Sequence, residues 1–122
     1  MPISKVQLFS IPVADQDASL AFYVGVLGFE LVADQPMGPG RRWVQLSIPG
    51  TETSVTLVTW FESMPAGSLR GLVLECDDLE GDVALLRERG VQIDDGIQSM
   101  PWGRFVNFAD PDGNGLILQT TA

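Results

Sequence analysis

The chain contains no histidine among its 122 residues. Histidine is the commonest ligand of catalytic transition metals and the commonest general base near neutral pH. Its absence excludes the nucleophile systems in which histidine activates a serine or a cysteine. The absence of histidine does not exclude a metal site built from carboxylates alone. Such a site would suit magnesium or calcium better than zinc or iron.

Cysteine and basic residues are also scarce. Cys76 is the only cysteine, so no internal disulfide can form, and its apolar neighbours predict a buried strand thiol. The chain has only 7 lysines and arginines but 16 aspartates and glutamates, which gives a formal net charge of −9. Because such a surface repels phosphates, we expect no binding to nucleic acid. The same charge attracts cationic partners or cationic small molecules.

Long hydrophobic runs are missing as well. No apolar run approaches the roughly 20 residues that are required to span a bilayer. The first residues lead straight into a strand pattern and do not resemble a signal peptide. We therefore expect a cytoplasmic protein with no membrane partner. A chain of this length that is 45% hydrophobic predicts one domain with a modest core.

What the sequence does contain is a repeated pattern. The first half predicts a strand, a helix that begins at Asp15 or Asp17 and ends at Gly28, and three further strands. The strands are expected at 3–13, 29–33, 43–48 and 54–60. An irregular segment follows at 61–69 and predicts a linker.

The second half repeats this order. It predicts a strand at 71–76, a helix that begins at Asp77 or Asp78 and ends at Gly90, a short strand at 91–93 and a loop at 94–101. Two alternating apolar runs then flank a tight turn rich in proline, aspartate and glycine, which is typical of a β-hairpin. The hairpin is expected at 105–118, with its turn at 110–114.

The spacing supports a duplicated module. Asp15 to Gly28 and Asp77 to Gly90 both span 13 residues, and the two halves are offset by 62. The offset aligns Trp43 with Phe105. We therefore predict an α+β fold made of two tandem βαβββ modules within one domain, residues 1–122. Module one covers 1–61, the linker lies within 61–69, and module two covers 70–122.

Two segments resemble a known family. The segment Ala18–Glu30 resembles the "FY…LGF" helix end of the vicinal oxygen chelate superfamily, and Phe108–Asn114 is similar to its "F.DPDGN" hairpin. That superfamily includes glyoxalase I, bleomycin-resistance proteins, extradiol dioxygenases and fosfomycin-resistance enzymes. The resemblance implies a curved mixed sheet around a cavity, with the helices on the outer faces. The resemblance also implies a homodimer, and the exposed edge strands of the two sheets would be available for contact with a second copy.

The resemblance also implies where metal ligands would stand. The metalloenzymes of the superfamily take histidines and glutamates from the first and last strand of each module. The matching positions here are Leu8 (or Gln7), Thr56, Gly71 and Ile117, none of which is a competent ligand. We therefore infer no catalytic metal and no cofactor, which places the metal-dependent activities of the superfamily in doubt.

Alternation along the strands predicts which side chains face the cavity. Val44, Leu46, Val106 and Phe108 form the apolar helix-facing set, so their neighbours face the other way. Arg104 is interpreted as a solvated or ion-paired surface group, and Trp102 is expected at the rim beside it. The candidate ligand-binding residues are Trp43, Gln45, Thr56, Trp60, Trp102, Phe105, Asn107 and Gln119. The alternative is that the tryptophans fill the core or a dimer interface.

The leading hypothesis is a metal-independent binding protein that resembles the bleomycin-resistance branch. It would sequester a planar aromatic or cationic antibiotic-like compound by stacking on tryptophan in an acidic groove. A second hypothesis is a metal-free enzyme in which Glu75, Asp94 or Asp95 acts as acid or base. A third is a non-catalytic structural subunit, in which the tryptophans serve dimer packing.

Overall fold

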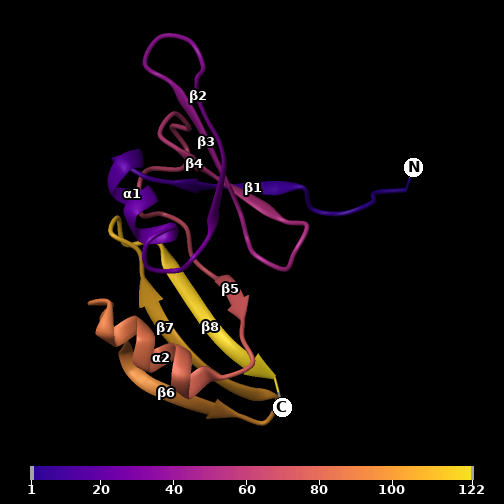
Figure 1. Cartoon of the computed structure of the whole chain (residues 1–122), viewed down its shortest axis with the longest axis vertical. Helices are drawn as coiled ribbons and strands as arrows, with labels where there is room; N and C mark the ends of the chain where they lie inside the picture. Colours follow the sequence, from indigo (N-terminus) through magenta and orange to yellow (C-terminus); the bar gives the residue numbers. More distant parts are fainter. Residues whose placement is uncertain (1, 122) are drawn as a thin grey trace. The chain divides into compact units, whose positions relative to one another are not determined.

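The structure, a computed structural model, describes residues 2–121. It divides into two compact units, with the boundary between Ala66 and Gly67. The first unit contains β1 (Leu8–Pro12), α1 (Gln16–Tyr23), β2 (Glu30–Pro36), β3 (Arg42–Ser47) and β4 (Ser54–Val58). The second contains β5 (Leu72–Glu75), α2 (Leu79–Glu88), β6 (Asp94–Met100), β7 (Gly103–Ala109) and β8 (Gly115–Thr121). Figure 1 labels these elements along the chain.

Each unit is a βαβββ module, as predicted. The strand order is β1-β4-β3-β2 in the first sheet and β5-β8-β7-β6 in the second. In each sheet the first and last strands of the module pair in parallel, and the other pairs are antiparallel. The two modules therefore share one topology, which is what a duplicated sequence requires.

Aspartates begin both helices. The carboxylate of Asp15 accepts hydrogen bonds from the backbone N–H groups of Asp17 and Ala18 at 2.9 and 3.2 Å, and Asp78 accepts one from Gly81 at 3.1 Å. Of the predicted alternatives, the structure selects Asp15 and Asp78. Each carboxylate satisfies N–H groups that have no partner within the helix.

The helix-facing side of each sheet carries the core. Val44, Leu46, Val106 and Phe108 are buried, as predicted. Two polar contacts show that this side faces the helix: Arg42 of β3 pairs with Asp17 of α1, and Arg104 of β7 pairs with Glu80 of α2. Figure 1 shows α2 lying along its own sheet, where it contacts β7 and β8.

Several predicted boundaries are wrong. The first helix ends at Tyr23 and not at Gly28, because the chain continues as a series of turns until Gly28 adopts a φ of 81°. The first strand begins at Leu8 instead of residue 3, and β4 ends at Val58, so Trp60 lies beyond it. β2 continues through Asp34 to Pro36, where a loop was predicted.

The largest error concerns β6. Residues 94–100 form this strand, although a loop was predicted there, and the strand predicted at 91–93 is absent from the described chain. The register of β6 on β7 shifts between Asp94 and Gln98, where Asp95 has a φ of 58° and Gly96 one of 67°. The irregular backbone accommodates residues of low β-propensity on an edge strand, where pairing with β7 outweighs propensity.

Candidate functional site

The candidate site is built on the open face of each sheet, which we define as the face opposite its helix. On the second sheet, strand pairing places Glu75, Gln119, Phe105 and Gln98 in one row across β5, β8, β7 and β6. The next row contains Val73, Ile117, Asn107 and Asp94. The predicted site residues Phe105, Asn107 and Gln119 thus share one face.

Trp102 adds an aromatic ring to this face. Its ring stacks on that of Phe105, with centroids 5.8 Å apart and planes inclined by 15°. The Trp102 side chain is 51% exposed, so a large aromatic surface remains in contact with solvent. Arg104 itself faces the helix side, where it pairs with Glu80. The interpretation of Arg104 as an ion-paired group is confirmed.

Glu75 supplies a carboxylate to the same face. The side chain is exposed at the end of β5, and its Oε1 accepts a hydrogen bond from the Thr121 hydroxyl at 2.9 Å. The cross-strand bond fixes the carboxylate beside Gln119. An aromatic pair, an amide and a carboxylate therefore lie together on one sheet.

The open face of the first sheet is more polar. Pairing places Ser10, Thr56 and Gln45 side by side across β1, β4 and β3. Trp43 Nε1 donates to Gln45 Oε1 at 3.2 Å, and the hydroxyls of Ser10 and Thr56 are 3.0 Å apart. Thr56 is only 1% exposed, so its hydroxyl is already engaged within the module.

Trp60 lies apart from this row because β4 ends two residues before it. The guanidinium of Arg41 lies 5.9 Å from the Trp60 ring centroid, and the Phe61 ring is 6.0 Å away. One side of the indole is therefore close to a cation of the same module. No sequence pattern predicts this contact, because Arg41 belongs to the loop before β3.

The comparisons with known proteins agree with this architecture. The model of the Glyoxalase/Bleomycin resistance protein/Dioxygenase superfamily matches residues 5–118. The chain belongs to this superfamily.

Two solved structures and one further protein are similar to this chain along nearly its whole length. TnmS3, an antibiotic binding protein from Streptomyces sp. CB03234, is 52% identical, with 100% of this chain and 99% of that chain covered and a TM-score of 0.94. A superfamily member from Sphaerobacter thermophilus DSM 20745 is 38% identical, covers 97% and 98%, and has a TM-score of 0.88. The uncharacterized protein YetH of Bacillus subtilis (strain 168) is 33% identical over 120 residues, covering 96% and 98%.

The residues do not fit the metal of the superfamily's metalloenzymes. Across the first and last strands of each module, the structure pairs Ser10 with Thr56 and Val73 with Ile117. The predicted positions Leu8 and Gly71 are displaced from these pairs, since Leu8 pairs with Ser54 and Gly71 precedes β5. Two hydroxyl groups and two hydrocarbon side chains are poor ligands for a transition-metal ion. Within residues 2–121, no group of three or more cysteines, aspartates or glutamates is placed to hold a metal ion.

The turn of the β7–β8 hairpin has a structural role in this module. Asp110 Oδ1 accepts from the N–H groups of Asp112 and Asn114, both at 2.9 Å, and Asp110 Oδ2 accepts from Asn114 Nδ2 at 2.8 Å. Asn114 Oδ1 in turn accepts from the backbone N–H of Leu69 at 3.0 Å. The turn therefore ties the β7–β8 hairpin to the segment that leads into β5.

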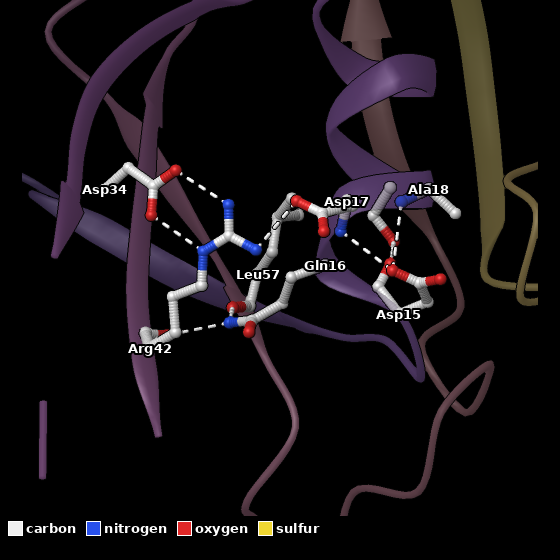
Figure 2. A network of polar contacts seen from close by, with 8 residues as sticks. Asp15, Gln16, Asp17, Ala18, Asp34, Arg42 and Leu57 are labelled. Atoms are coloured by element: carbon white, nitrogen blue, oxygen red, sulfur yellow. Dashed lines mark hydrogen bonds and ion pairs between the residues drawn. The ribbon is translucent and has the colours of Figure 1, made fainter. Parts of the chain in front are cut away.

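A second network supports the first module. Figure 2 shows the Arg42 guanidinium between Asp34 of β2 and Asp17 of α1, with N–O distances of 2.7 and 2.8 Å. Gln16 Nε2 donates to the carbonyls of Arg42 and Leu57 at 2.7 and 2.8 Å. The hydrogen bond from Arg42 lowers the pKa of Asp34, and its carboxylate partners raise the pKa of Arg42. Together these contacts hold the start of α1 against β3 and β4.

Among the described residues, no helix is long and apolar enough to cross a membrane.

Proposed function

We propose that this chain is a metal-independent small-molecule-binding protein that sequesters a planar aromatic, antibiotic-like compound. The observation that carries the proposal is the exposed Trp102–Phe105 pair on the open face of the second sheet, with Gln119 and Asn107 beside it. A stacked, solvent-facing aromatic pair next to amide groups is a suitable platform for a flat ring system.

The relatives support the same function. TnmS3 is named an antibiotic binding protein, and it matches this chain along its whole length at 52% identity. At the positions that the resemblance assigns to metal ligands, this chain carries Leu8 (or Gln7), Thr56, Gly71 and Ile117, which suits binding without metal chemistry. We therefore propose that affinity, and not turnover, is the function.

The physical basis of this binding is burial of aromatic surface. An aromatic pair contributes about 0.5–1.5 kcal/mol beyond the area that it buries. The side-chain amides of Asn107 and Gln119 offer both donors and acceptors that would fix the orientation of a ligand ring. Trp43 and Gln45 offer a similar combination on the first sheet, although Trp43 Nε1 is already bonded to Gln45.

We also propose that the chain forms a homodimer. In the described part of the chain, β1 and β2 are the edge strands of the first sheet, and β5 and β6 are those of the second. Edge strands present N–H and C=O groups that a second copy can cover. Light scattering coupled to gel filtration tests this, since a mass near the 13.2 kDa of one chain would contradict it.

The test of the proposed function is a titration with a panel of planar aromatic compounds, followed by tryptophan fluorescence and thermal shift. We expect quenching and a raised unfolding temperature with the wild-type protein, and weaker binding by Trp102→Ala. Trp60→Ala is the matched control, because Trp60 lies outside the strands and close to Arg41. The compound should be recovered chemically unchanged. Conversion that depends on Glu75 or Asp94 would instead favour a metal-free enzyme.

A further inference from the structure

We propose that the open face of the second sheet selects a planar ligand that carries a positive charge, with Glu75 as the residue that recognises the charge. The inference rests on the proposed function and names the class of ligand. The row Glu75–Gln119–Phe105, extended by Trp102, is the structural basis for it.

The register of the sheet sets the size of such a ligand. Glu75 pairs with Gln119, and Gln119 pairs with Phe105, so the carboxylate and the aromatic pair stand two strands apart on one face. Neighbouring strands lie about 4.8 Å apart, which places Glu75 about 10 Å from Phe105 across the sheet. That span suits a positively charged ligand of two or three fused rings. Gln119 would lie beneath the middle of the ring system.

The environment of Glu75 favours recognition of a cation. Its Oε1 accepts from Thr121, which orients the carboxylate without neutralising its charge. The ion pairs among residues 2–121 involve Lys5, Arg42 and Arg104, and none of them engages Glu75. A cationic ring stacked on Trp102 would also gain a cation–π contact.

The first sheet has the opposite character. Its open-face row of Ser10, Thr56 and Gln45 contains no carboxylate. Its Trp60 ring already has the guanidinium of Arg41 beside it, which would repel a second cation. Charge selection is therefore assigned to the second sheet, where Glu75 shares a row with Phe105. On the first sheet, the open-face carboxylate Glu30 lies opposite Ser47, in a different row from Gln45.

The experiment compares two probes of the same shape at pH 8: 9-aminoacridine, which is a cation at this pH, and acridine, which is neutral. Calorimetric titrations are performed with the wild-type chain, with Glu75→Gln and with Glu88→Gln. The last variant removes the same charge from an exposed position of α2. Glutamine at position 75 keeps an oxygen that can accept from Thr121, so the sheet should keep its structure.

We expect Glu75→Gln to weaken the binding of 9-aminoacridine by about tenfold, the factor that corresponds to loss of one partly exposed charge contact. Acridine should bind both proteins within a factor of about two, and Glu88→Gln should bind both probes like the wild type. Added salt should weaken 9-aminoacridine binding in the wild type more than in Glu75→Gln.

Four outcomes would overturn the inference. Equal losses in Glu75→Gln and Glu88→Gln would show that only the overall charge matters. Equal losses for both probes would give Glu75 a purely structural role. If acridine and 9-aminoacridine bind the wild type equally and Glu75→Gln changes neither, the aromatic-binding function stands and the charge selection fails. If neither probe binds the wild type, the inference is rejected, and the panel titration with Trp102→Ala decides separately on the proposed function.

Discussion

Asn114 shows how much a single residue of the hairpin turn contributes. Its side chain is fully buried, donates to Asp110 and accepts from the backbone N–H of Leu69. A buried donor or acceptor that loses its partner costs the full desolvation of that group. The motif that identified the family from the sequence is therefore explained, in this chain, by hydrogen bonding within the second module.

The first prediction follows from that network. Asn114→Ala should lower the free energy of unfolding by about 2–3 kcal/mol, because it removes the acceptor of the Leu69 N–H and one donor to the Asp110 carboxylate. Urea denaturation measures the change. Asn107→Ala is the matched control, since Asn107 is only half-buried on the open face, and it should cost less than about 1 kcal/mol. Equal losses in the two variants would contradict the role of Asn114.

The second prediction concerns Cys76, which follows β5. Burial, together with the nearby carboxylate of Asp82, raises the pKa of the Cys76 thiol to about 11. At pH 8 only about one thiol in a thousand would then be ionised, and the thiolate is the nucleophile. Alkylation by iodoacetamide at pH 8 should accordingly be far slower than that of free cysteine, with mass spectrometry as the readout. Labelling at the rate of free cysteine would show that the thiol is not protected.

At the scale of elements, the Arg42 network positions α1. Arg42 joins β2, β3 and the first turn of α1, and Gln16 adds two bonds to the backbone of β3 and β4 (Figure 2). An aspartate in the first helical turn also complements the positive end of the helix dipole. The helix is thus attached through polar contacts at its start and through buried Phe22 and Tyr23 farther along.

The third prediction is a pH dependence that arises from this network. The hydrogen bond from Arg42 holds the pKa of Asp34 below its ordinary value of 3.8. A carboxyl group whose folded pKa is lowered stabilises the fold above its unfolded pKa, and this contribution is lost as the pH falls through the folded pKa. The unfolding temperature should therefore fall as the pH drops below about 4, and Asp34→Asn should make that fall smaller.

The control for this measurement is Asp95→Asn. Asp95 takes part in none of the ion pairs of the described chain, and asparagine tolerates its positive φ of 58°. A pH profile that is unchanged by Asp34→Asn, or changed equally by Asp95→Asn, would contradict the assigned role of Arg42.

The elements that the sequence predicted are those with strong local signals. The aspartate caps and the turn of the last hairpin follow from local chemistry, and the structure confirms both. The strand at 94–100 could not be predicted, because its residues favour a loop and only pairing with β7 makes it a strand. The end of α1 was misplaced because a glycine can close a run of turns as well as a helix.

At the scale of the whole molecule, the duplicated module explains why the shared face of some candidate site residues was predictable. The repeat and the alternation along strands placed Phe105, Asn107 and Gln119 on one face, as strand pairing confirms. The stacking of Trp102 on Phe105 and the approach of Arg41 to Trp60 involve residues outside regular strands. Alternation has no meaning there, so only the structure could show these contacts.

The repeat also leaves two aromatic positions with different surroundings. Trp43 and Phe105 correspond under the offset of 62 residues, and both lie on the open faces of their sheets. Trp43 is bonded to Gln45, whereas Phe105 stacks on Trp102. The duplicated scaffold therefore supports one polar and one aromatic platform, which is consistent with a ligand that is recognised by stacking on the second sheet.

The most direct test of metal-independent binding is a calorimetric titration of the planar aromatic panel into protein that has been treated with a chelator and dialysed. We predict that at least one compound binds with the same affinity before and after metal removal, and that chromatography recovers it unchanged. Trp102→Ala should weaken that binding by about two- to tenfold, in line with the loss of one aromatic stacking contact. Binding that disappears with the chelator and returns with an added divalent ion, or release of a chemically altered compound, would contradict the proposal.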